Sequence, residues 1–159
     1  MMNRIVVDTN PLSYIYFGVP ELGKEYARLL GRLSGQHTLL IPKIVYGELS
    51  LVFRDVQEME LFLHEAGIVV GEISRKSYTT AARRWQEYSE RRVLSCPKCG
   101  RKMKPVYCEQ CESEIRIRQH VLTDFLVGAY ALETEGHQLV TNDAGYYSTY
   151  FPEIDLIVA

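Results

Sequence analysis

Short runs rich in Val, Ile and Leu alternate along this chain with longer segments whose apolar residues recur at helical spacing. The short runs predict strands at residues 5–7, 38–41, 68–70, 138–140 and 154–158. Helices are predicted at residues 9–16, 20–34, 42–52, 56–66, 74–93 and 117–136, with a short helical turn at 142–147. Because parallel strands need crossover connections, usually helices, this alternation predicts an α/β fold with a central parallel sheet and helices on both of its faces.

The length and the composition fit a single globular domain, spanning residues 1–159. A chain of 159 residues can bury a substantial core, and a hydrophobic fraction of 47% is ordinary for such a protein. No apolar run approaches the roughly 20 residues that cross a bilayer. The first apolar run has three residues and ends at a carboxylate, unlike a secretory signal. We therefore expect a cytoplasmic protein that is not associated with a membrane.

All four cysteines lie in residues 95–113, a segment that interrupts the alternation of strands and helices. Cys96 and Cys99 form one Cys-x-x-Cys pair, and Cys108 and Cys111 form a second, with eight residues between the pairs. Such pairs supply four thiolates to a tetrahedral Zn²⁺ ion and leave no open position, which predicts a structural zinc ribbon inserted in the domain. The alternatives are redox-active pairs, although neither pair opens a helix after a strand, and an iron–sulfur cluster.

Basic residues are concentrated around the cysteine segment. Between Arg83 and Arg118 the chain has ten Lys or Arg and five Glu, whereas the remainder has eight basic and fifteen acidic residues. This distribution suits a protein that holds a phosphate backbone near carboxylates and metal, although a solvated surface would have the same pattern. The ribbon is interpreted either as an RNA-binding finger or as a docking surface for a partner or second subunit. The candidates for nucleic-acid contact are Arg91, Arg92, Arg101, Lys102, Lys104, Arg116 and Arg118.

Four acidic residues are predicted to lie at one edge of the sheet. Asp8 follows the first strand, and Glu48 lies in the helix after the second. Asp124 lies in the first turns of the helix before the fourth strand, and Asp143 follows that strand. Ligands bind at the carboxyl ends of parallel strands, and carboxylates that converge there raise one another's pKa values unless a divalent cation such as Mg²⁺ or Mn²⁺ offsets the repulsion. Taken singly, each acid could instead be a helix cap or a dipole partner.

The motifs around these acids resemble those of the PIN-domain nucleases, and most of all the VapC type of toxin-associated ribonuclease. The resemblance covers nearly the whole chain apart from the cysteine segment. Each motif is short, and their order and spacing make the set specific. The matching residues are Val7-Asp8-Thr9-Asn10, Ile41-Pro42 through Glu48, residues 124–129, Leu139-Val140-Thr141-Asn142-Asp143 with Tyr146-Tyr147 following, and Tyr150-Phe151-Pro152.

The resemblance implies a three-layer α/β/α fold and an endoribonuclease that hydrolyses RNA phosphodiester bonds with Mg²⁺ or Mn²⁺. By position, it assigns the metal and the catalysis to Asp8, Glu48, Asp124 and Asp143. Thr9, Asn10 and Thr141 match small polar residues beside these acids. We expect Asn10 and Thr141 to orient Asp8 or a metal-bound water, with helix and turn capping as the equal alternative. Besides RNA, the resemblance suggests an antitoxin protein and a homodimer as partners.

Other interpretations remain open. The cysteine insertion departs from the ordinary VapC plan, so the role could be that of a toxin or of an RNA-processing nuclease. The main alternative is a non-catalytic module that binds RNA or protein and has a structural zinc ribbon. A phosphatase of the haloacid-dehalogenase type also begins with a strand that ends in Asp, but it needs a second Asp where this chain has Asn10.

Overall fold

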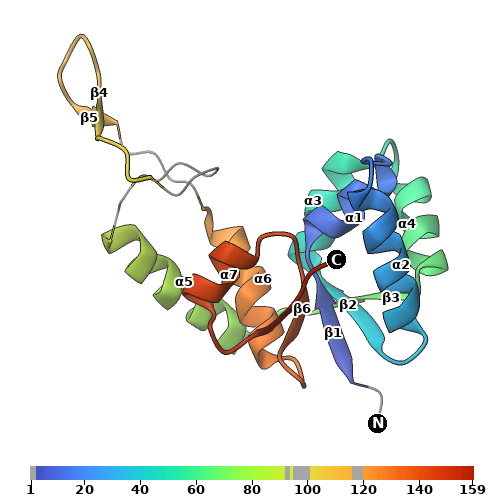
Figure 1. Cartoon of the computed structure of the whole chain (residues 1–159). Helices are drawn as coiled ribbons and strands as arrows, with labels where there is room; N and C mark the ends of the chain where they lie inside the picture. Colours follow the sequence, from blue (N-terminus) through green and yellow to red (C-terminus); the bar gives the residue numbers. More distant parts are fainter. Residues whose placement is uncertain (1–2, 92–93, 95–100, 116–119) are drawn as a thin grey trace.

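The computed structural model describes residues 3–91, 94, 101–115 and 120–159, and its centre is a five-stranded sheet with the order β3-β2-β1-β6-β7 (Figure 1). Each of the four pairings in this sheet is parallel. The α/β fold with a central parallel sheet, predicted from the alternation of strands and helices, is therefore confirmed. The strands are β1 (Arg4–Val7), β2 (Thr38–Pro42), β3 (Ile68–Gly71), β6 (Gln138–Val140) and β7 (Asp155–Ile157).

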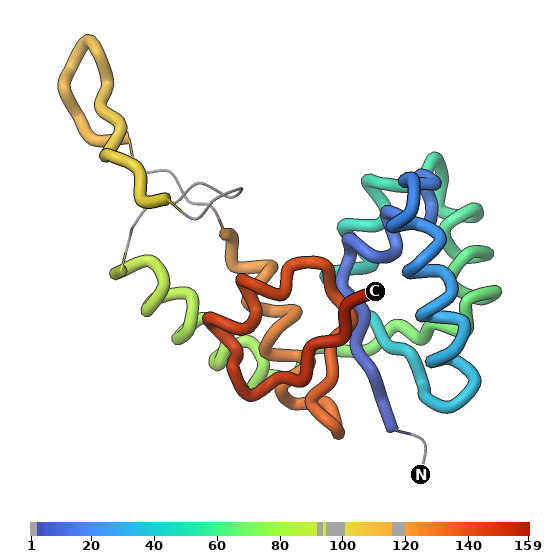
Figure 2. Tube along the Cα trace, in the orientation of Figure 1, coloured from blue at the N-terminus to red at the C-terminus, as the bar shows by residue number. Residues whose placement is uncertain are grey.

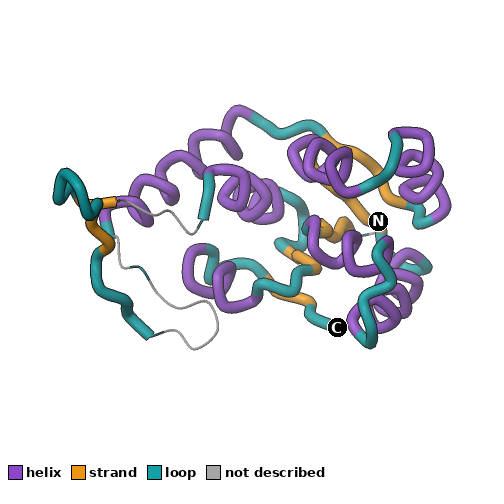
Figure 3. Tube along the Cα trace, turned by 90° about the horizontal axis from the view of Figure 1, so that it is seen from above, coloured by secondary structure: helices purple, strands orange, loops and turns teal. Residues whose placement is uncertain are grey.

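Helices flank the sheet on both sides, as Figures 1 and 3 show. One group lies to the right of β1 in Figure 1 and the other to its left. The two groups make the outer layers of a three-layer arrangement, with the sheet between them. The first group is α1 (Thr9–Tyr16), α2 (Leu22–Ser34), α3 (Lys43–Val52) and α4 (Val56–Glu65), and the second is α5 (Arg75–Glu90), α6 (Leu122–Glu133) and α7 (Ala144–Tyr150).

The strand order reverses between β1 and β6. The chain adds β2 and then β3 on one side of β1, and it later adds β6 and β7 on the other side. In the register of this pairing, Val6 lies opposite Leu139 and Val7 lies opposite Val140. The loops that leave β1 and β6 diverge at such a point, and ligands of open α/β sheets bind there. The topology thus places the residues that follow these two strands at the natural binding position of the fold.

The central strands are apolar because helices cover both of their faces. Ile5, Val6 and Val7 of β1 have at most 1% of their surface exposed, and Leu139 and Val140 of β6 have none. A parallel strand buried on both faces shows a continuous apolar run in place of alternation. That run ends at Asp8, so a carboxylate is carried directly from the core to the end of the strand.

Several helix boundaries differ from the predictions. Helix α5 ends at Glu90, before the predicted end near residue 93, and α2 begins at Leu22, after Glu21 with a φ of 62°. Helix α6 begins at Leu122, although apolar residues at helical spacing start at residue 117. The reason lies at its first turn, where the Asp124 carboxylate accepts a hydrogen bond from the backbone N–H of Val121 and satisfies a donor that the helix leaves free (3.0 Å).

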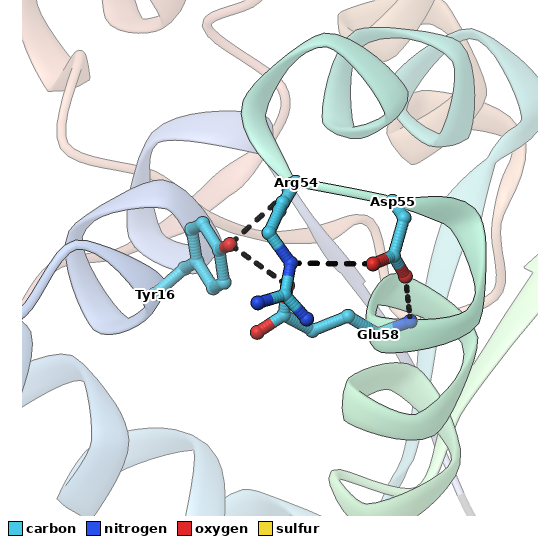
Figure 4. Close-up of polar contacts among 4 residues, drawn as sticks. All are labelled: Tyr16, Arg54, Asp55 and Glu58. Carbon is cyan, nitrogen blue, oxygen red and sulfur yellow. Dashed lines mark hydrogen bonds and ion pairs between the residues drawn. The ribbon is translucent and has the colours of Figure 1, made fainter.

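The turn between α3 and α4 is tied to the end of α1 by polar contacts (Figure 4). Asp55 caps α4 by accepting from the backbone N–H of Glu58 at 2.8 Å. The Tyr16 hydroxyl donates to Glu58 at 3.1 Å and accepts from the backbone N–H of Arg54 at 3.2 Å. The Arg54 guanidinium also donates to Asp55 at 3.3 Å. These contacts join the end of α1, the turn after α3 and the start of α4. All three belong to the helix layer that also contains Glu48.

The cysteine segment and the residues that follow it form a two-stranded antiparallel hairpin, β4 (Val106–Tyr107) and β5 (Glu114–Ile115), that projects from the rest of the chain (Figure 2). The predicted zinc ribbon falls partly on this hairpin, because Cys108 and Cys111 belong to it, whereas Cys96 and Cys99 lie outside the described residues. Among the helices that the structure describes, none combines the length and apolar character needed to span a membrane.

Candidate active site at the ends of β1 and β6

Asp8 occupies the point where the strand order reverses. Its backbone N–H continues the sheet by donating to the carbonyl oxygen of Val140 at 2.9 Å. Its carboxylate accepts from the backbone N–H of Thr9 at 2.8 Å and thereby caps α1. The Thr141 hydroxyl donates to its other oxygen at 2.9 Å. Asp8 is therefore fixed in orientation by groups from both strands of the reversal, with only 8% of its surface exposed.

The environment of Asp8 disfavours a negative charge. Burial raises the pKa of Asp8 from 3.8 to about 6, the hydrogen bonds from Thr141 and Thr9 lower it, and the charges of Glu48 and Asp124 raise it. Desolvation and nearby like charges both oppose ionisation, and the two hydrogen bonds do not compensate for them. A positive charge placed beside the Asp8 carboxylate would therefore stabilise its ionised form.

Glu48 reaches Asp8 from the helix that follows β2. It lies in the second turn of α3, and its carboxylate accepts a hydrogen bond from the Thr9 hydroxyl. Thr9 thus links the two acids, since its backbone N–H serves Asp8 and its side chain serves Glu48. Thr9 therefore contacts two of the predicted acids and is also the first residue of α1.

Asp124 approaches from the opposite layer. It lies in the first turn of α6, and one of its oxygens accepts from the N–H of Val121. The same oxygen is 3.6 Å from Nδ1 of His120, which precedes α6 and is not part of the helix. Asp124 combines a capping role with proximity to Asp8, since its charge raises the pKa of Asp8.

Asp143 is connected to Asp8 through one threonine side chain. The Thr141 hydroxyl, fully buried, donates to Asp8 and accepts from the backbone N–H of Asp143 at 3.0 Å. The carbonyl of Thr141 in turn accepts from the buried hydroxyl of Tyr26 on α2 at 3.0 Å. The Thr141 hydroxyl therefore contacts both the Asp8 carboxylate and the backbone of Asp143. No hydrogen bond joins the Asn10 side chain to Asp8 within the described residues.

Carboxylate oxygens are the ligands that Mg²⁺ and Mn²⁺ prefer, and the raised pKa of Asp8 shows where a cation would be favourable. Within the described ranges, no group of three or more His, Cys, Asp or Glu side chains forms a ready-made metal site. Mg²⁺ usually keeps several waters and binds proteins through one or two carboxylates together with substrate phosphates. A compact cage of protein ligands is thus not required for Mg²⁺, and the carboxylate oxygens present are donors that fit Mg²⁺ or Mn²⁺.

Two aromatic side chains belong to this region although their types did not single them out. The ring of Tyr146 on α7 stacks on the ring of His120, with centroids 4.2 Å apart. Burial and then the charges of Asp124, Asp143 and Asp8 raise the pKa of Tyr146. In the sequence, Tyr146 appears only within one of the matching motifs, and its spacing of three residues from Asp143 is the one sign of a place near the acids.

The predicted nucleic-acid contacts lie partly beyond the structure. Arg91, at the C-terminal end of α5, and Arg101, Lys102 and Lys104, near the hairpin, are exposed. Arg92, Arg116 and Arg118 fall outside the described residues. The described basic side chains are therefore available to solvent and to a ligand.

A sequence profile of the PIN domain matches residues 5–152. The chain belongs to the PIN-domain family. Proteins of this family are generally nucleases, so membership assigns a nuclease class of activity to the chain. The region matched to the PIN domain contains all four predicted acids and also the cysteine segment.

The PIN fold of this chain is similar to that of a chain in the crystal structure of VapBC2 from Rickettsia felis, bound to a DNA fragment from their promoter. The two chains are 18% identical, with a TM-score of 0.63, and the match covers 98% of each. At this identity the similarity concerns the fold. No curated protein matches the sequence.

Proposed function

We propose that this PIN-domain protein is an endoribonuclease that hydrolyses RNA phosphodiester bonds with Mg²⁺ or Mn²⁺. The acids that would hold the cation are Asp8, Glu48, Asp124 and Asp143. The observation that carries the proposal is the buried carboxylate of Asp8 at the strand-order reversal, with its pKa raised by burial and by the charges of Glu48 and Asp124. A divalent cation would offset this unfavourable charge.

A bound cation would activate a water and offset charge on the phosphate. The protein's own contribution is orientation. Thr141 and the backbone of Thr9 hold both oxygens of Asp8, and the Thr9 hydroxyl holds Glu48. Partners that fix metal ligands in this way usually matter for affinity and activity by about 10- to 100-fold.

The proposal is tested by cleavage of labelled single-stranded and structured RNA in Mg²⁺ or Mn²⁺. Asp8→Asn and Asp143→Asn are expected to reduce kcat by about 100-fold or more, because each removes a charge that would hold the cation. Glu135→Gln is the matched control, since this exposed acid follows the far end of α6. It is expected to cleave at the wild-type rate, and a chelator is expected to stop cleavage by both proteins.

Circular dichroism would establish that each variant folds. Cleavage undiminished in folded Asp8→Asn and Asp143→Asn would remove the assigned site. RNA binding by the wild type without cleavage in either metal would favour the alternative, a non-catalytic module that binds RNA or protein.

The hairpin supports the second part of the proposal, a structural Zn²⁺ bound by Cys96, Cys99, Cys108 and Cys111. Cys108 and Cys111 are both free thiols, placed where β4 turns into β5. Hydrogen bonds with Ser113, and then with Cys108, lower the pKa of Cys111. A thiol with a lowered pKa is a better metal ligand, because the thiolate is the form that binds.

For the partners, we propose RNA as substrate, with an antitoxin protein and a second copy of the chain as further candidates. The VapBC2 structure from Rickettsia felis contains a complex bound to promoter DNA, which supports a search for a similar partner. We propose a cytoplasmic location for either role. A small DNA-binding protein encoded beside this chain would favour a toxin role over an RNA-processing role. Exposed Arg101, Lys102 and Lys104, which precede the hairpin, make this region a candidate for RNA contact.

A further inference from the structure

The hydroxyl of Tyr146 is buried, yet it has no hydrogen-bond partner among the described residues. The residue as a whole is 6% exposed. Buried polar groups almost always have a partner, because leaving one without a partner costs free energy. An unpartnered hydroxyl in a functional region therefore indicates a group whose partner arrives with a ligand.

The surrounding rings fix the position of this hydroxyl. The Tyr146 ring stacks on His120 at 4.2 Å and meets the ring of Phe125 edge-on at 5.4 Å. The rings of Tyr147 and Tyr150 lie 4.7 and 5.3 Å away. Because aromatic neighbours pack around the ring, the hydroxyl is held in one place without a polar contact of its own.

The hydroxyl belongs to the acidic site by position. Tyr146 is one turn along α7 from Asp143, which precedes the helix. His120, on which it stacks, is 3.6 Å from a carboxylate oxygen of Asp124. Burial and then the charges of Asp124, Asp143 and Asp8 raise the pKa of Tyr146, so the phenol stays protonated and remains a donor.

The other hydroxyls of the site are already used. Thr9 donates to Glu48, and Thr141 donates to Asp8. A phosphodiester that enters among carboxylates carries further negative charge, so it needs donors that are not yet engaged. Within the described part of the site, the Tyr146 hydroxyl meets this requirement.

We propose that Tyr146 is a further catalytic residue, whose hydroxyl donates a hydrogen bond to a non-bridging oxygen of the scissile phosphodiester. This inference rests on the proposed nuclease function. The donor is uncharged and held by its neighbours before the substrate binds, so no reorganisation is needed as charge develops on the phosphate. The hydrogen bond would strengthen in the transition state and contribute to kcat more than to KM.

The test is Tyr146→Phe, which keeps the ring and removes only the hydroxyl. We expect kcat to fall by about 100- to 1,000-fold, the range for loss of one donor to a transition-state oxygen, while KM changes little. The affinity for Mn²⁺, measured by calorimetry, should equal that of the wild type. The matched control is Tyr130→Phe, in the last turn of α6, which should retain the wild-type kcat.

A second measurement separates contact with the phosphate from a structural role. Substrates with sulfur in place of either non-bridging oxygen are compared in wild type and in Tyr146→Phe. For one diastereomer, we expect the slowing caused by sulfur to be smaller in the variant, because the hydrogen bond to that oxygen is already absent. The other diastereomer should show the same slowing in both proteins.

The outcomes distinguish this inference from the function on which it rests. A wild-type kcat in Tyr146→Phe, or a loss of kcat with unchanged sulfur effects for both diastereomers, would overturn the role of Tyr146 alone. A reduced Mn²⁺ affinity would also overturn it, since the residue would then act through the metal site. A wild-type protein that cleaves no RNA would overturn both proposals.

Discussion

Asp8 combines two requirements that conflict at the scale of a single residue. It follows three buried residues of β1, so most of its surface is removed from water, and it must also present a carboxylate at the strand-order reversal. The hydrogen bonds from Thr9 and Thr141 reduce the conflict without removing it, because the pKa of Asp8 remains raised. A buried carboxylate with a raised pKa is typical of functional sites, because stability alone would favour an uncharged residue at that position.

The stability of the metal-free protein should depend on pH through Asp8. The pKa is about 6 in the folded state against 3.8 for the ordinary group, so the folded state binds this proton more tightly. The resulting stabilisation is fully present below pH 3.8 and is lost as pH rises through about 6. Asp8→Asn removes this loss and should be more stable than wild type at pH 8 by about 3 kcal/mol.

Urea denaturation in a chelating buffer would measure this difference at pH 8 and at pH 3.5, where the two proteins should be similar. Adding Mn²⁺ at pH 8 should stabilise the wild type and not Asp8→Asn. An equal pH dependence in both proteins would contradict the assignment to Asp8.

Thr141 should matter through its hydroxyl. Thr141→Val keeps the shape but removes the donor to Asp8 and the acceptor for the N–H of Asp143, which leaves buried polar groups without partners. We expect the free energy of unfolding to fall by about 2–3 kcal/mol and kcat to fall by about 10- to 100-fold. Thr141→Ser retains both hydrogen bonds and should keep most of the activity, so equal losses in the two variants would argue against the hydroxyl.

At the scale of elements, the layer of α5, α6 and α7 is held together by contacts that also position the acidic site. Arg84 on α5 donates to the carbonyl oxygen of Tyr150 at 2.6 Å and forms a two-point ion pair with Glu153 (2.9 and 2.6 Å). Its guanidinium also lies 4.6 Å from the centre of the Phe151 ring. These contacts fix the end of α7, and therefore the helix that carries Tyr146.

Gly128 allows α6 to approach Phe151 closely. A Cβ at Gly128 would lie 2.4 Å from an atom of the Phe151 ring, which real structures do not tolerate. We expect Gly128→Ala to lower the free energy of unfolding by about 1–3 kcal/mol, the usual cost of overpacking.

Gly31 provides the matched control for this substitution. It lies within α2, and a Cβ there would meet no atom within 4 Å. Gly31→Ala should raise the free energy of unfolding by about 0.5–1 kcal/mol, because alanine favours a helix. Denaturant titration of both variants measures the contrast, and a stabilised Gly128→Ala would contradict the close approach.

At the scale of the whole molecule, the chain is a PIN domain with a hairpin that projects from it (Figure 2). Val106, Tyr107 and Ile115 of this hairpin are exposed, so two short strands alone bury little apolar surface. Isolated two-stranded hairpins are marginally stable in water. A metal ion at the cysteines would supply the stability that packing does not.

The purified protein should therefore contain about one equivalent of zinc, measured by elemental analysis, since four thiolates complete a tetrahedral site. Cys108→Ser and Cys111→Ser should each lower this content strongly. The far-ultraviolet circular dichroism of the PIN domain should change little, because the hairpin lies outside its sheet. Iron in place of zinc, or four freely titratable thiols in the native protein, would contradict the zinc ribbon.

The sequence by itself determined the architecture and the neighbourhood of the predicted acids. Apolar runs and helical spacing are local properties, so they predicted the five parallel strands and every described helix, with differences only at helix boundaries. The acids could be placed at strand ends because each follows or flanks such a run. The insertion was visible for the same reason, since it interrupts the pattern.

Only the tertiary structure decided which groups meet. The bond between Thr141 and Asp8 joins residues 133 positions apart, and the tie between Arg84 and Glu153 spans 69. No local pattern encodes such pairs, because they depend on how the layers pack. The same holds for Tyr146. Its hydroxyl is buried without a hydrogen-bond partner among the described residues because the tertiary structure packs His120 and Phe125 against its ring.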